Sequence, residues 1–512
     1  MAPSDPRGPD RPTADPAPPP PGAHVAPPTF GGDADTAPLD RAAVLARLAP
    51  ELEAAWASFD RPRPVEPALD PALEARLRGP LPEHPGDAEA ALEDAVRVLD
   101  ASISPARPLY LAYVGSTGLE SGVLAEALAA TYDVNMAATA GSADLVERQA
   151  LEWLAEFLGY PLAEGSFTSG GMTSNLTALL VARERALPGS REQGVGEGRA
   201  AVYCSAEAHH SVVRAVEAAG LGTRSVRRLG LDARRRLRPE ELDEALETDR
   251  AVGVVPVAVV ANGGTTLTGA VDPLDAVADV CERHGVWLHV DGAYGLPAAG
   301  TATARPLFAG LERADSITVD AHKWLGVQKS CSAVLLRDRG GLEAAFGHEE
   351  QYMLHDNAIP NAVDQTLEYS RPFRSLKLWL AFRVHGAATF RSWIEGTLDH
   401  ARRLAALVAA DPSFEIVHEP ALSTVCFRHA PPGVADLDGH NLRLARAIPL
   451  DGRVYLAPAT VDGRVCLRVC FVNFRTRPES IPFVLDVVRE LGERLVRGGD
   501  AAGPGTAFDR TA

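Results

Sequence analysis

The chain has 512 residues, of which 46% are hydrophobic, so it can bury a large core divided over two or three domains. Its formal net charge of −18 argues against nucleic-acid binding, which needs a basic surface, and favours small-molecule partners. The first residues lack a basic stretch followed by an apolar one, and no run of about 18 apolar residues occurs. We therefore expect neither a secretory signal nor a membrane span.

The six cysteines are scattered over the chain and do not form the dense pattern of a disulfide-stapled fold, which predicts a reduced, cytoplasmic protein. Cys466 and Cys470 could also be interpreted as a pair of metal ligands. They lie in an expected strand, where a rise of about 3.3 Å per residue puts them roughly 13 Å apart. Because no cluster of further histidine or cysteine ligands accompanies them, we predict no metal site.

The two ends of the chain differ from its middle. Residues 1–38 are rich in proline, alanine, glycine and aspartate and predict a disordered tail, with a polyproline recognition ligand as the alternative. Helical patterns follow at residues 39–59 and 88–101, within a helical segment that we place at residues 39–115. Residues 497–512 are rich in glycine and alanine and predict a second flexible tail.

Short apolar segments alternate with helical ones between residues 120 and 340. The expected strands cover residues 200–204, 251–260, 286–290 and 316–319. Continuous apolar strands separated by helices are typical of a mostly parallel sheet covered on both faces, in an α/β domain that we place at residues 116–375. A helix at 378–410, strands at 423–428 and 465–472 and a helix at 482–497 predict a smaller α+β domain at 376–496.

The segment Asp320-Ala321-His322-Lys323-Trp324 follows directly on an expected buried strand and presents a lysine at a strand end. A lysine amine condenses with an aldehyde cofactor, which makes Lys323 a candidate Schiff-base residue. Most lysines are solvated surface groups, so this pattern alone is weak. Three further segments supply the other parts of a pyridoxal phosphate site.

The first of these segments is Thr168-Ser169-Gly170-Gly171-Met172-Thr173-Ser174-Asn175. Its two glycines allow the backbone to approach a ligand closely, and Ser174 or Asn175 is expected to cap a helix at residues 176–186. The free N–H groups of a helix N-terminus favour a phosphate. An ordinary glycine-rich turn has the same pattern, whereas a Walker loop is excluded because no Gly-Lys-Ser/Thr follows.

Asp291 and His209 are the remaining parts of the predicted site. Asp291 ends an expected strand, where its carboxylate can pair with a pyridinium nitrogen and keep it protonated. A protonated ring is the electron sink of pyridoxal phosphate chemistry. His209 follows the strand that ends at Cys204, and its flat imidazole can stack on the ring. Alone, Asp291 could equally cap a helix and His209 could be a surface histidine; together the segments occur in the order that one site requires.

On these residues the sequence resembles the group II pyridoxal-phosphate-dependent amino-acid decarboxylases, which include glutamate, aromatic amino-acid and cysteine-sulfinate decarboxylases. The resemblance covers about residues 107–482 and is most specific at 168–175, 208–209, 289–295, 322–323 and 374–379; residues 116–119 are similar to the glutamate branch. It implies fold type I, with a mostly parallel, seven-stranded type of sheet in a large domain and a smaller C-terminal domain. It also implies an obligate homodimer, with active sites at the interface and the N-terminal helices packed on the partner.

The resemblance also assigns roles to residues. It makes Lys323 the Schiff-base lysine, Asp291 the partner of the pyridine nitrogen, His209 the stacking ring, and Tyr352 a proton donor that reaches in from the other subunit. The other cofactor contacts that it implies are Ser169, Gly170, Gly171, Met172, Thr265, Thr266, Ala293, Asp320 and His322. The substrate contacts that it implies are Tyr113, Val114, Asn135 and Arg468.

Two positions depart from the family pattern. Asp320 stands where some relatives carry asparagine beside the phosphate, which puts an extra negative charge near that group. Val114 and Asn135 stand where members that act on aromatic substrates have large rings, which weakens an aromatic assignment. Arg468 matches an arginine that meets the side-chain carboxylate in the glutamate branch but occurs in other branches too, so the substrate's side chain stays open.

The predicted reaction is the removal of CO₂ from the α-carbon of an L-amino acid with release of a primary amine, by a carboxy-lyase. Aldehyde-forming relatives replace the tyrosine that matches Tyr352 or the stacking histidine, and this chain keeps both. A transaminase-like or oxidative-deaminating enzyme of the same fold is one alternative. A catalytically silent scaffold is another, against which Lys323 and Asp291 count. The expected partners are an amino-acid substrate and a second copy of the chain, with no nucleic acid and no membrane.

Overall fold

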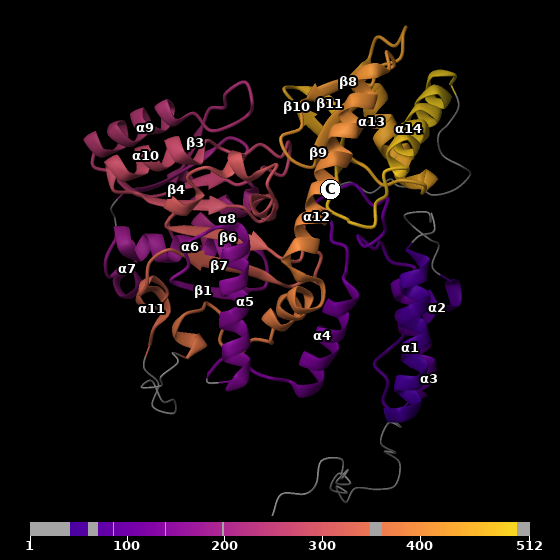
Figure 1. Cartoon of the computed structure of the whole chain (residues 1–512), viewed down its shortest axis with the longest axis horizontal. Helices are drawn as coiled ribbons and strands as arrows, with labels where there is room; N and C mark the ends of the chain where they lie inside the picture. The colour runs from indigo at the N-terminus through magenta and orange to yellow at the C-terminus, as the bar shows by residue number, and fades with distance from the viewer. Residues whose placement is uncertain are drawn as a thin grey trace, which may run out of the picture.

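The computed structural model describes residues 41–59, 70–84, 86–138, 140–196, 199–348 and 361–498. Two β-sheets organise this part of the chain, one of seven strands and one of four (Figure 1). Helix α12 (Ser375–Ala410) runs from beside the larger sheet to the smaller one. Of the helices in the described ranges, none is both long and apolar enough to cross a membrane.

The seven-stranded sheet confirms the prediction of a mostly parallel α/β fold. Its order is β1 (Glu164–Thr168), β7 (Ser332–Leu336), β6 (Ser316–Asp320), β5 (Trp287–Asp291), β4 (Val255–Asn262), β2 (Ala200–Ser205) and β3 (Val226–Leu229). Strands β6, β5, β4, β2 and β3 pair in parallel, and β7 is antiparallel to both of its neighbours. The sequence prediction missed β1, β3 and β7.

Helices cover both faces of this sheet, which explains why β4, β5 and β6 are buried at nearly every position. One face packs on α6 (Gly171–Ala186), α8 (His210–Ala218) and α11 (Gly341–Phe346). The other packs on α5 (Ser142–Leu158), α9 (Pro239–Ala251), α10 (Leu274–His284) and the first half of α12. Along β4, Val260 faces the first layer and Val259 the second, as the alternation of side chains in a strand requires.

Helix α6 begins at Gly171, five residues before the predicted start at residue 176. Ser174 and Asn175 therefore lie inside the helix, and the prediction that one of them caps it is wrong. The first helical hydrogen bond runs from the N–H of Ser174 to the carbonyl of Gly170, at 3.0 Å. No side chain within the described ranges caps the helix, so its first N–H groups are left for another acceptor.

The four-stranded sheet forms the smaller α+β unit. Its order is β10 (Ala457–Val461), β11 (Arg464–Cys470), β9 (Thr424–His429) and β8 (Phe414–His418), antiparallel throughout. Helices α13 (Leu437–Asp451) and α14 (Ser480–Val496) and the second half of α12 pack on it. Helix α12 changes direction at Gly386, where φ is 74°, a value that side-chain-bearing residues rarely adopt. The prediction found β9 and β11 and missed β8 and β10.

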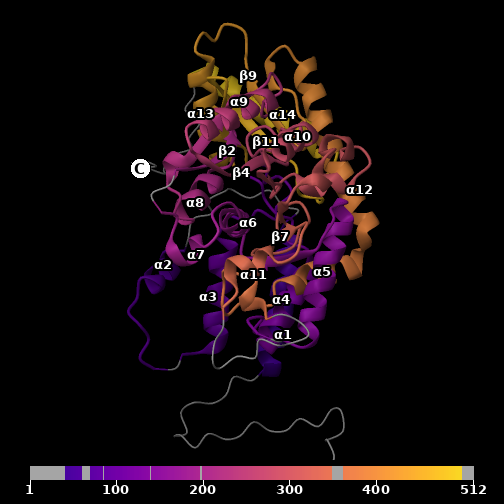
Figure 2. The ribbon, with the colours of Figure 1, turned by 90° about the vertical axis from the view of Figure 1, so that its left-hand side faces the viewer.

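The N-terminal helices stand apart from both sheets. They are α1 (Arg41–Ser58), α2 (Pro71–Leu77) and α3 (Ala88–Asp100), and both ribbon views place them in the lower part of the molecule (Figures 1 and 2). Ion pairs between Arg47 and Glu93 at 3.0 Å and between Arg76 and Asp94 at 2.7 Å hold them to one another. Helix α3 has no buried residue.

Polar contacts join the two units next to the carboxyl ends of the parallel strands. Arg235 pairs with Glu207 on the large unit and with Asp462 in the β10–β11 turn. The hydroxyl groups of Tyr294 and Ser423 lie 2.6 Å apart. The Nε atom of Arg468 on β11 donates to the carbonyl of Leu267 at 3.3 Å. Two further α-helices in the described ranges are α4 (Glu120–Tyr132) and α7 (Ser190–Gln193).

Candidate active site

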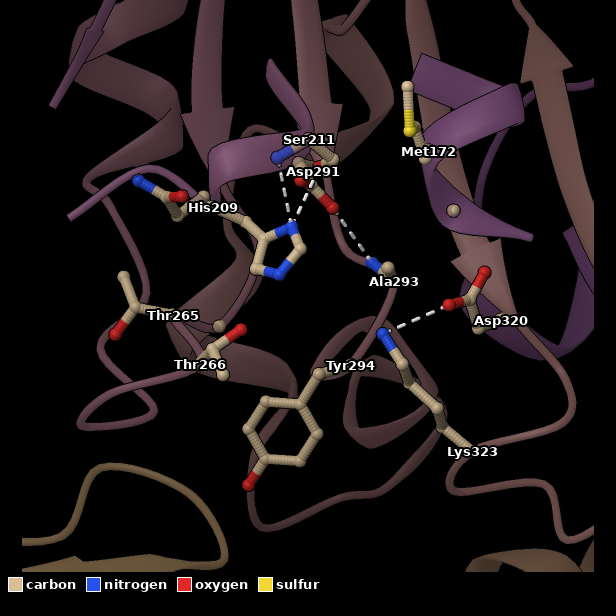
Figure 3. A pocket seen from close by; sticks show the side chains of 13 residues that line it. Met172, His209, Ser211, Thr265, Thr266, Asp291, Ala293, Tyr294, Asp320 and Lys323 are labelled. Atoms are coloured by element: carbon tan, nitrogen blue, oxygen red, sulfur yellow. Dashed lines mark hydrogen bonds and ion pairs between the residues drawn. The ribbon is translucent and has the colours of Figure 1, made fainter. Parts of the chain in front are cut away.

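The candidate site lies where β4, β5 and β6 end in polar residues, Asn262, Asp291 and Asp320, and where α6 begins. Parallel strands bring their carboxyl ends to one edge of the sheet, which is where α/β folds bind ligands. The pocket at this edge is shown in Figure 3. It is lined by Gly171, Met172, His209, Ser211, Asn262, Gly264, Thr265, Thr266, Asp291, Ala293, Tyr294, Asp320 and Lys323.

Asp291 is fixed by hydrogen bonds on both of its oxygens. Oδ2 accepts from the side-chain amide of Asn175 at 2.8 Å, and Oδ1 accepts from the backbone N–H of Ala293 at 3.2 Å. Only 7% of the residue is exposed. The carboxylate is therefore held in one orientation at the end of β5, with its charge compensated by donors that carry no charge themselves.

A buried chain of hydrogen bonds continues behind Asn175. Its Oδ1 atom can only accept, so the Nε2 atom of His289, 3.1 Å away, donates to it. The Nδ1 atom of His289 then accepts from the hydroxyl of Ser316 at 2.9 Å. Burial lowers the pKa of His289 to about 4, so the ring is neutral near pH 7. Asp291 thus rests on a neutral network in which each member is oriented by the next.

His209 occupies the N-cap position of α8, and its ring points into the pocket between Asp291 and the turn that carries Thr265 and Thr266 (Figure 3). Its Nδ1 atom accepts from the backbone N–H of Ser211 at 3.2 Å and lies 2.8 Å from the Ser211 hydroxyl. Partial burial lowers the pKa of His209 more than the Asp291 carboxylate raises it. The ring is therefore neutral near pH 7, flat and fixed at one edge.

Lys323 follows β6, and its ammonium lies 2.9 Å from the Oδ2 atom of Asp320, the last residue of that strand. The Nε2 atom of His322 is 3.6 Å from the same oxygen. Asp320 is 2% exposed. Burial raises the pKa of its carboxyl group, and the nearby Lys323, His322 and Ser332 together lower it by more, so the pKa lies below its ordinary value. In the cofactor-free protein Lys323 and Asp320 form an ion pair at the wall of the pocket.

The first turn of α6 comes close to this ion pair. A Cβ atom on Gly171 would lie 3.0 Å from the Cβ of Ala293 and 3.1 Å from the Oδ2 of Asp320, which is tighter than ordinary contact. A Cβ atom on Gly170 would meet nothing within 4 Å. Glycine at position 171 thus lets the helix N-terminus enter the pocket wall beside Asp320.

Most of the sequence-predicted cofactor residues meet in this pocket. Its lining contains Gly171, Met172, His209, Thr265, Thr266, Asp291, Ala293, Asp320 and Lys323. Ser169 and Gly170 directly precede α6, and His322 lies behind Asp320. Tyr352 lies outside the described residues.

The four predicted substrate residues do not line the pocket of the single chain. The Tyr113 side chain is 59% exposed, and Val114 packs at the edge of the main core. Asn135 accepts from the backbone N–H groups of Ala137 and Arg371, at 3.1 and 3.2 Å. Arg468 is 4% exposed, and its Nη2 atom has no hydrogen-bond partner among the described residues. Their role in substrate binding stays a prediction.

Four polar residues that shape the site were not predicted in these roles: Asn175 as the support of Asp291, and Ser211, Asn262 and Tyr294 in the pocket lining. Ser211 could have been found, because it lies two residues after His209, within reach of its ring. Asn175 could not, because its partner Asp291 is 116 positions further along the chain.

Comparison with known proteins agrees with this geometry. Residues 71–430 match the family model described as the pyridoxal-dependent decarboxylase conserved domain. An aromatic-L-amino-acid decarboxylase of Bacillus atrophaeus is 33% identical over 445 residues, which cover 85% of this chain and 92% of that protein. A cysteine sulfinic acid decarboxylase of Rattus norvegicus is 35% identical over 318 residues, which cover 60% and 64%.

Solved structures agree as well. The crystal structure of the Oryza sativa protein TDC with PLP and tryptamine superposes with a TM-score of 0.83 at 27% identity, covering 90% of this chain and 99% of that one. The family match spans more than half of the sequence and includes the strand ends that build the pocket. The chain therefore belongs to the pyridoxal-dependent decarboxylase family and is a carboxy-lyase that uses pyridoxal phosphate to decarboxylate an amino acid.

Proposed function

We propose that this enzyme is an L-amino-acid α-decarboxylase that releases a primary amine, and that Lys323, Asp291 and His209 are its central catalytic residues. The observation that carries the proposal is that an amine, a fixed carboxylate and a neutral flat ring surround one pocket at the carboxyl edge of the sheet. The bound cofactor supplies an electron sink for the bond between the α-carbon and its carboxylate.

The described residues fit pyridoxal phosphate. The amine of Lys323 is available in the pocket for the aldehyde carbon, and Asp291 offers an anionic partner for the ring nitrogen. The free N–H groups at Gly171 and Met172 suit an anionic phosphate, because no side chain in the described part of the chain caps them. Thr265 and Thr266 line the pocket below the His209 ring. Asp320 is the exception, since it adds a carboxylate beside the proposed phosphate position.

Arg468 is proposed to bind a carboxylate of the substrate. A guanidinium stays charged at any physiological pH, and a buried charge needs a partner. Its Nε atom bonds the carbonyl of Leu267, next to Thr265 and Thr266, and its Nη2 atom is left without a partner among the described residues. An incoming carboxylate would satisfy this group. Whether that carboxylate is the α-carboxylate or a side-chain one depends on the substrate.

We further propose that the chain works as a cytoplasmic homodimer. Helix α3 has no buried residue, and Leu77, Leu81 and Leu99 on and between the N-terminal helices are 56%, 81% and 71% exposed. Apolar side chains at that exposure favour a covering surface, which a second copy would provide. In this arrangement the helical segment at residues 39–115 packs on the partner, and Tyr352 serves the partner's site as the acid that protonates the α-carbon.

The proposed reaction is tested with a screen of the standard amino acids plus diaminobutyrate and cysteine sulfinate, in which CO₂, amine, aldehyde and peroxide are all measured. We expect one substrate class to give CO₂ and amine in equal amounts. Aldehyde and peroxide in place of amine would identify the oxidative-deaminating alternative. A bound cofactor with no CO₂ from any amino acid would overturn the proposal and favour the silent scaffold.

The proposed dimer is tested by mixing subunits. Lys323→Ala chains and Tyr352→Phe chains are each expected to be inactive. A mixed dimer contains one site with both intact residues if Tyr352 acts across the interface, so it should recover about half of the wild-type activity per dimer. Mixed dimers no more active than the parents would show that Tyr352 acts in its own subunit or is not the proton donor.

A further inference from the structure

The feature that the proposed function leaves unexplained is the second oxygen of Asp320. Oδ2 pairs with Lys323 at 2.9 Å, but Oδ1 is buried and has no hydrogen-bond partner in any of the described segments. Both oxygens face the first turn of α6, because a Cβ atom on Gly171 would lie 3.1 Å from Oδ2 and 3.2 Å from Oδ1. A buried carboxylate oxygen without a donor is unusual, since burial of an unpaired charge is strongly unfavourable.

The surroundings of Asp320 offer it few other charges. Lys323 and His322 lie on its own loop, and Lys329 follows further along the same loop. His209 and Asp291 face it across the pocket. The first turn of α6 carries no ionisable residue, and β7 presents Ser332 opposite Asp320. The ammonium of Lys323 is therefore the one positive charge in direct contact with this carboxylate among the described residues.

Cofactor binding changes both the ion pair of Asp320 with Lys323 and the space between Asp320 and the first turn of α6. The inference rests on the proposed function, in which the amine of Lys323 is used for the aldehyde carbon and the phosphate lies at the N-terminus of α6. Asp320 then shares its cationic partner with the cofactor and gains an anionic neighbour. Each change favours a neutral carboxylic acid over a carboxylate. A protonated Asp320 can also donate one hydrogen bond, which the phosphate oxygens can accept.

We propose that Asp320 couples the binding of the cofactor's phosphate to the uptake of one proton. The carboxylate is ionised and paired with Lys323 in the cofactor-free protein. When the cofactor binds, Lys323 condenses with the aldehyde and releases water, and its nitrogen keeps one positive charge. One proton from solvent converts Asp320 into a carboxylic acid that donates to the phosphate. Affinity for the cofactor consequently falls as the pH rises, and it falls more steeply for the cofactor with its phosphate than for the ring alone.

The test measures protons directly. Cofactor-free enzyme is titrated with pyridoxal phosphate by calorimetry in buffers of different ionisation enthalpy, which gives the number of protons exchanged. We expect the wild type to take up close to one proton more than Asp320→Asn. With pyridoxal, which lacks the phosphate, the difference between the two proteins should shrink. The dissociation constant for pyridoxal phosphate should rise by up to about tenfold per pH unit in the wild type and less in the variant.

Two further variants keep the result interpretable. Asp315→Asn makes the same change at a buried aspartate that precedes the other end of β6 and is bonded to the N–H of Leu288, so it should behave as the wild type. Asp320→Ser replaces Asp320→Asn if the amide variant does not fold. Equal proton uptake in the wild type and the Asp320 variants would overturn the inference.

The inference and the proposed function fail in different ways. If borohydride still reduces an adduct onto Lys323 while the Asp320 variants exchange the same protons as the wild type, the proposed function stands and the inference falls. If the phosphate adds no affinity over pyridoxal in either protein, the phosphate does not lie at α6 and the inference falls with that placement. Weaker binding of pyridoxal phosphate by Asp320→Asn at every pH would also overturn it.

Discussion

Two buried aspartates end neighbouring strands of the same sheet, and their surroundings differ. Asp291 on β5 accepts one hydrogen bond on each oxygen, from Asn175 and from the backbone of Ala293. Asp320 on β6 has one oxygen paired with Lys323 and one with no partner among the described residues. The first carboxylate is held by neutral groups that stay in place, and the second by a cation that the reaction itself uses. We call Asp291 the permanent charge, because its hydrogen-bond partners stay in place. We call Lys323 the exchangeable partner of Asp320, because the reaction uses it.

The largest effect is expected from Lys323→Ala, which removes the exchangeable partner. Turnover and the visible absorption band of the bound cofactor should both disappear, because no amine remains for the aldehyde. The cofactor-free protein should also lose about 1–3 kcal/mol of stability near pH 7, since Asp320 stays buried without a partner. Asp320→Asn in the same chain should restore most of that loss. A borohydride-reducible adduct at full stoichiometry in Lys323→Ala would place the Schiff base on another lysine.

Asp291→Asn neutralises the permanent charge and should leave the cofactor bound. The amide cannot hold the ring nitrogen protonated, so the electron sink is weakened. A hydrogen bond to a charged group is worth about 1.5–3 kcal/mol, which corresponds to a loss of at least about tenfold to a hundredfold in kcat. The check is kcat at saturating cofactor and substrate. A kcat near that of the wild type would remove Asp291 from this role.

Asn175→Ala tests the neutral support behind Asp291. The substitution leaves Asp291, Ser211 and His289 each without one hydrogen bond, which should lower the free energy of unfolding by about 1–3 kcal/mol. It should also lower kcat, less than Asp291→Asn does, because the carboxylate remains but is no longer fixed. Thermal unfolding and kcat are measured together, with Ser211→Ala as the matched smaller deletion. Unchanged values in both measurements would show that the network does not support the site.

The smallest expected effect is the pH dependence of stability that the buried His289 causes. Burial lowers its pKa to about 4, whereas an unfolded chain has about 6.5. Between these values the unfolded chain binds a proton that the native protein excludes, so stability is complete above about pH 6.5 and falls as the pH drops. From pH 7 to pH 5 the contribution amounts to about 2 kcal/mol. The free energy of unfolding, measured with urea at several pH values, should lose this part of its pH dependence in His289→Gln. The same substitution at the exposed His210 should leave the pH dependence unchanged.

The sequence predicted those features that short segments determine by themselves. Strands β2, β4, β5 and β6 contain short apolar segments and end in polar residues, and Lys323, Asp291 and His209 were predicted from their positions at or after such ends. Strand β1 (Glu164–Thr168) has a single large apolar residue, Phe167, and forms because it pairs along β7, more than 160 positions later. Pairing between segments so far apart in the sequence leaves no pattern within the strand itself from which it could be predicted.

The start of α6 and the unpaired oxygen of Asp320 could not be predicted from the sequence for a related reason. The segment before Leu176 contains residues that commonly cap helices, yet the helix begins earlier, at Gly171, where the chain passes close to Ala293 and Asp320. The unpaired oxygen of Asp320 depends on how closely α6 approaches the end of β6. The sequence did predict an extra negative charge beside the phosphate, from the residue type alone.

The contacts of Arg235 bear on how this protein could be recombined with its relatives. Arg235 belongs to the large unit, yet it joins Glu207, two positions before His209, to Asp462 in the β10–β11 turn. A chimaera that exchanges the chain after residue 375 would keep both sheets and still replace one end of this bridge. The segment that can be replaced without loss of contacts is therefore limited by the ion pairs that cross between the two units, and not only by the extent of the smaller sheet. A functional hybrid would need Glu207, Arg235 and Asp462 from the same parent.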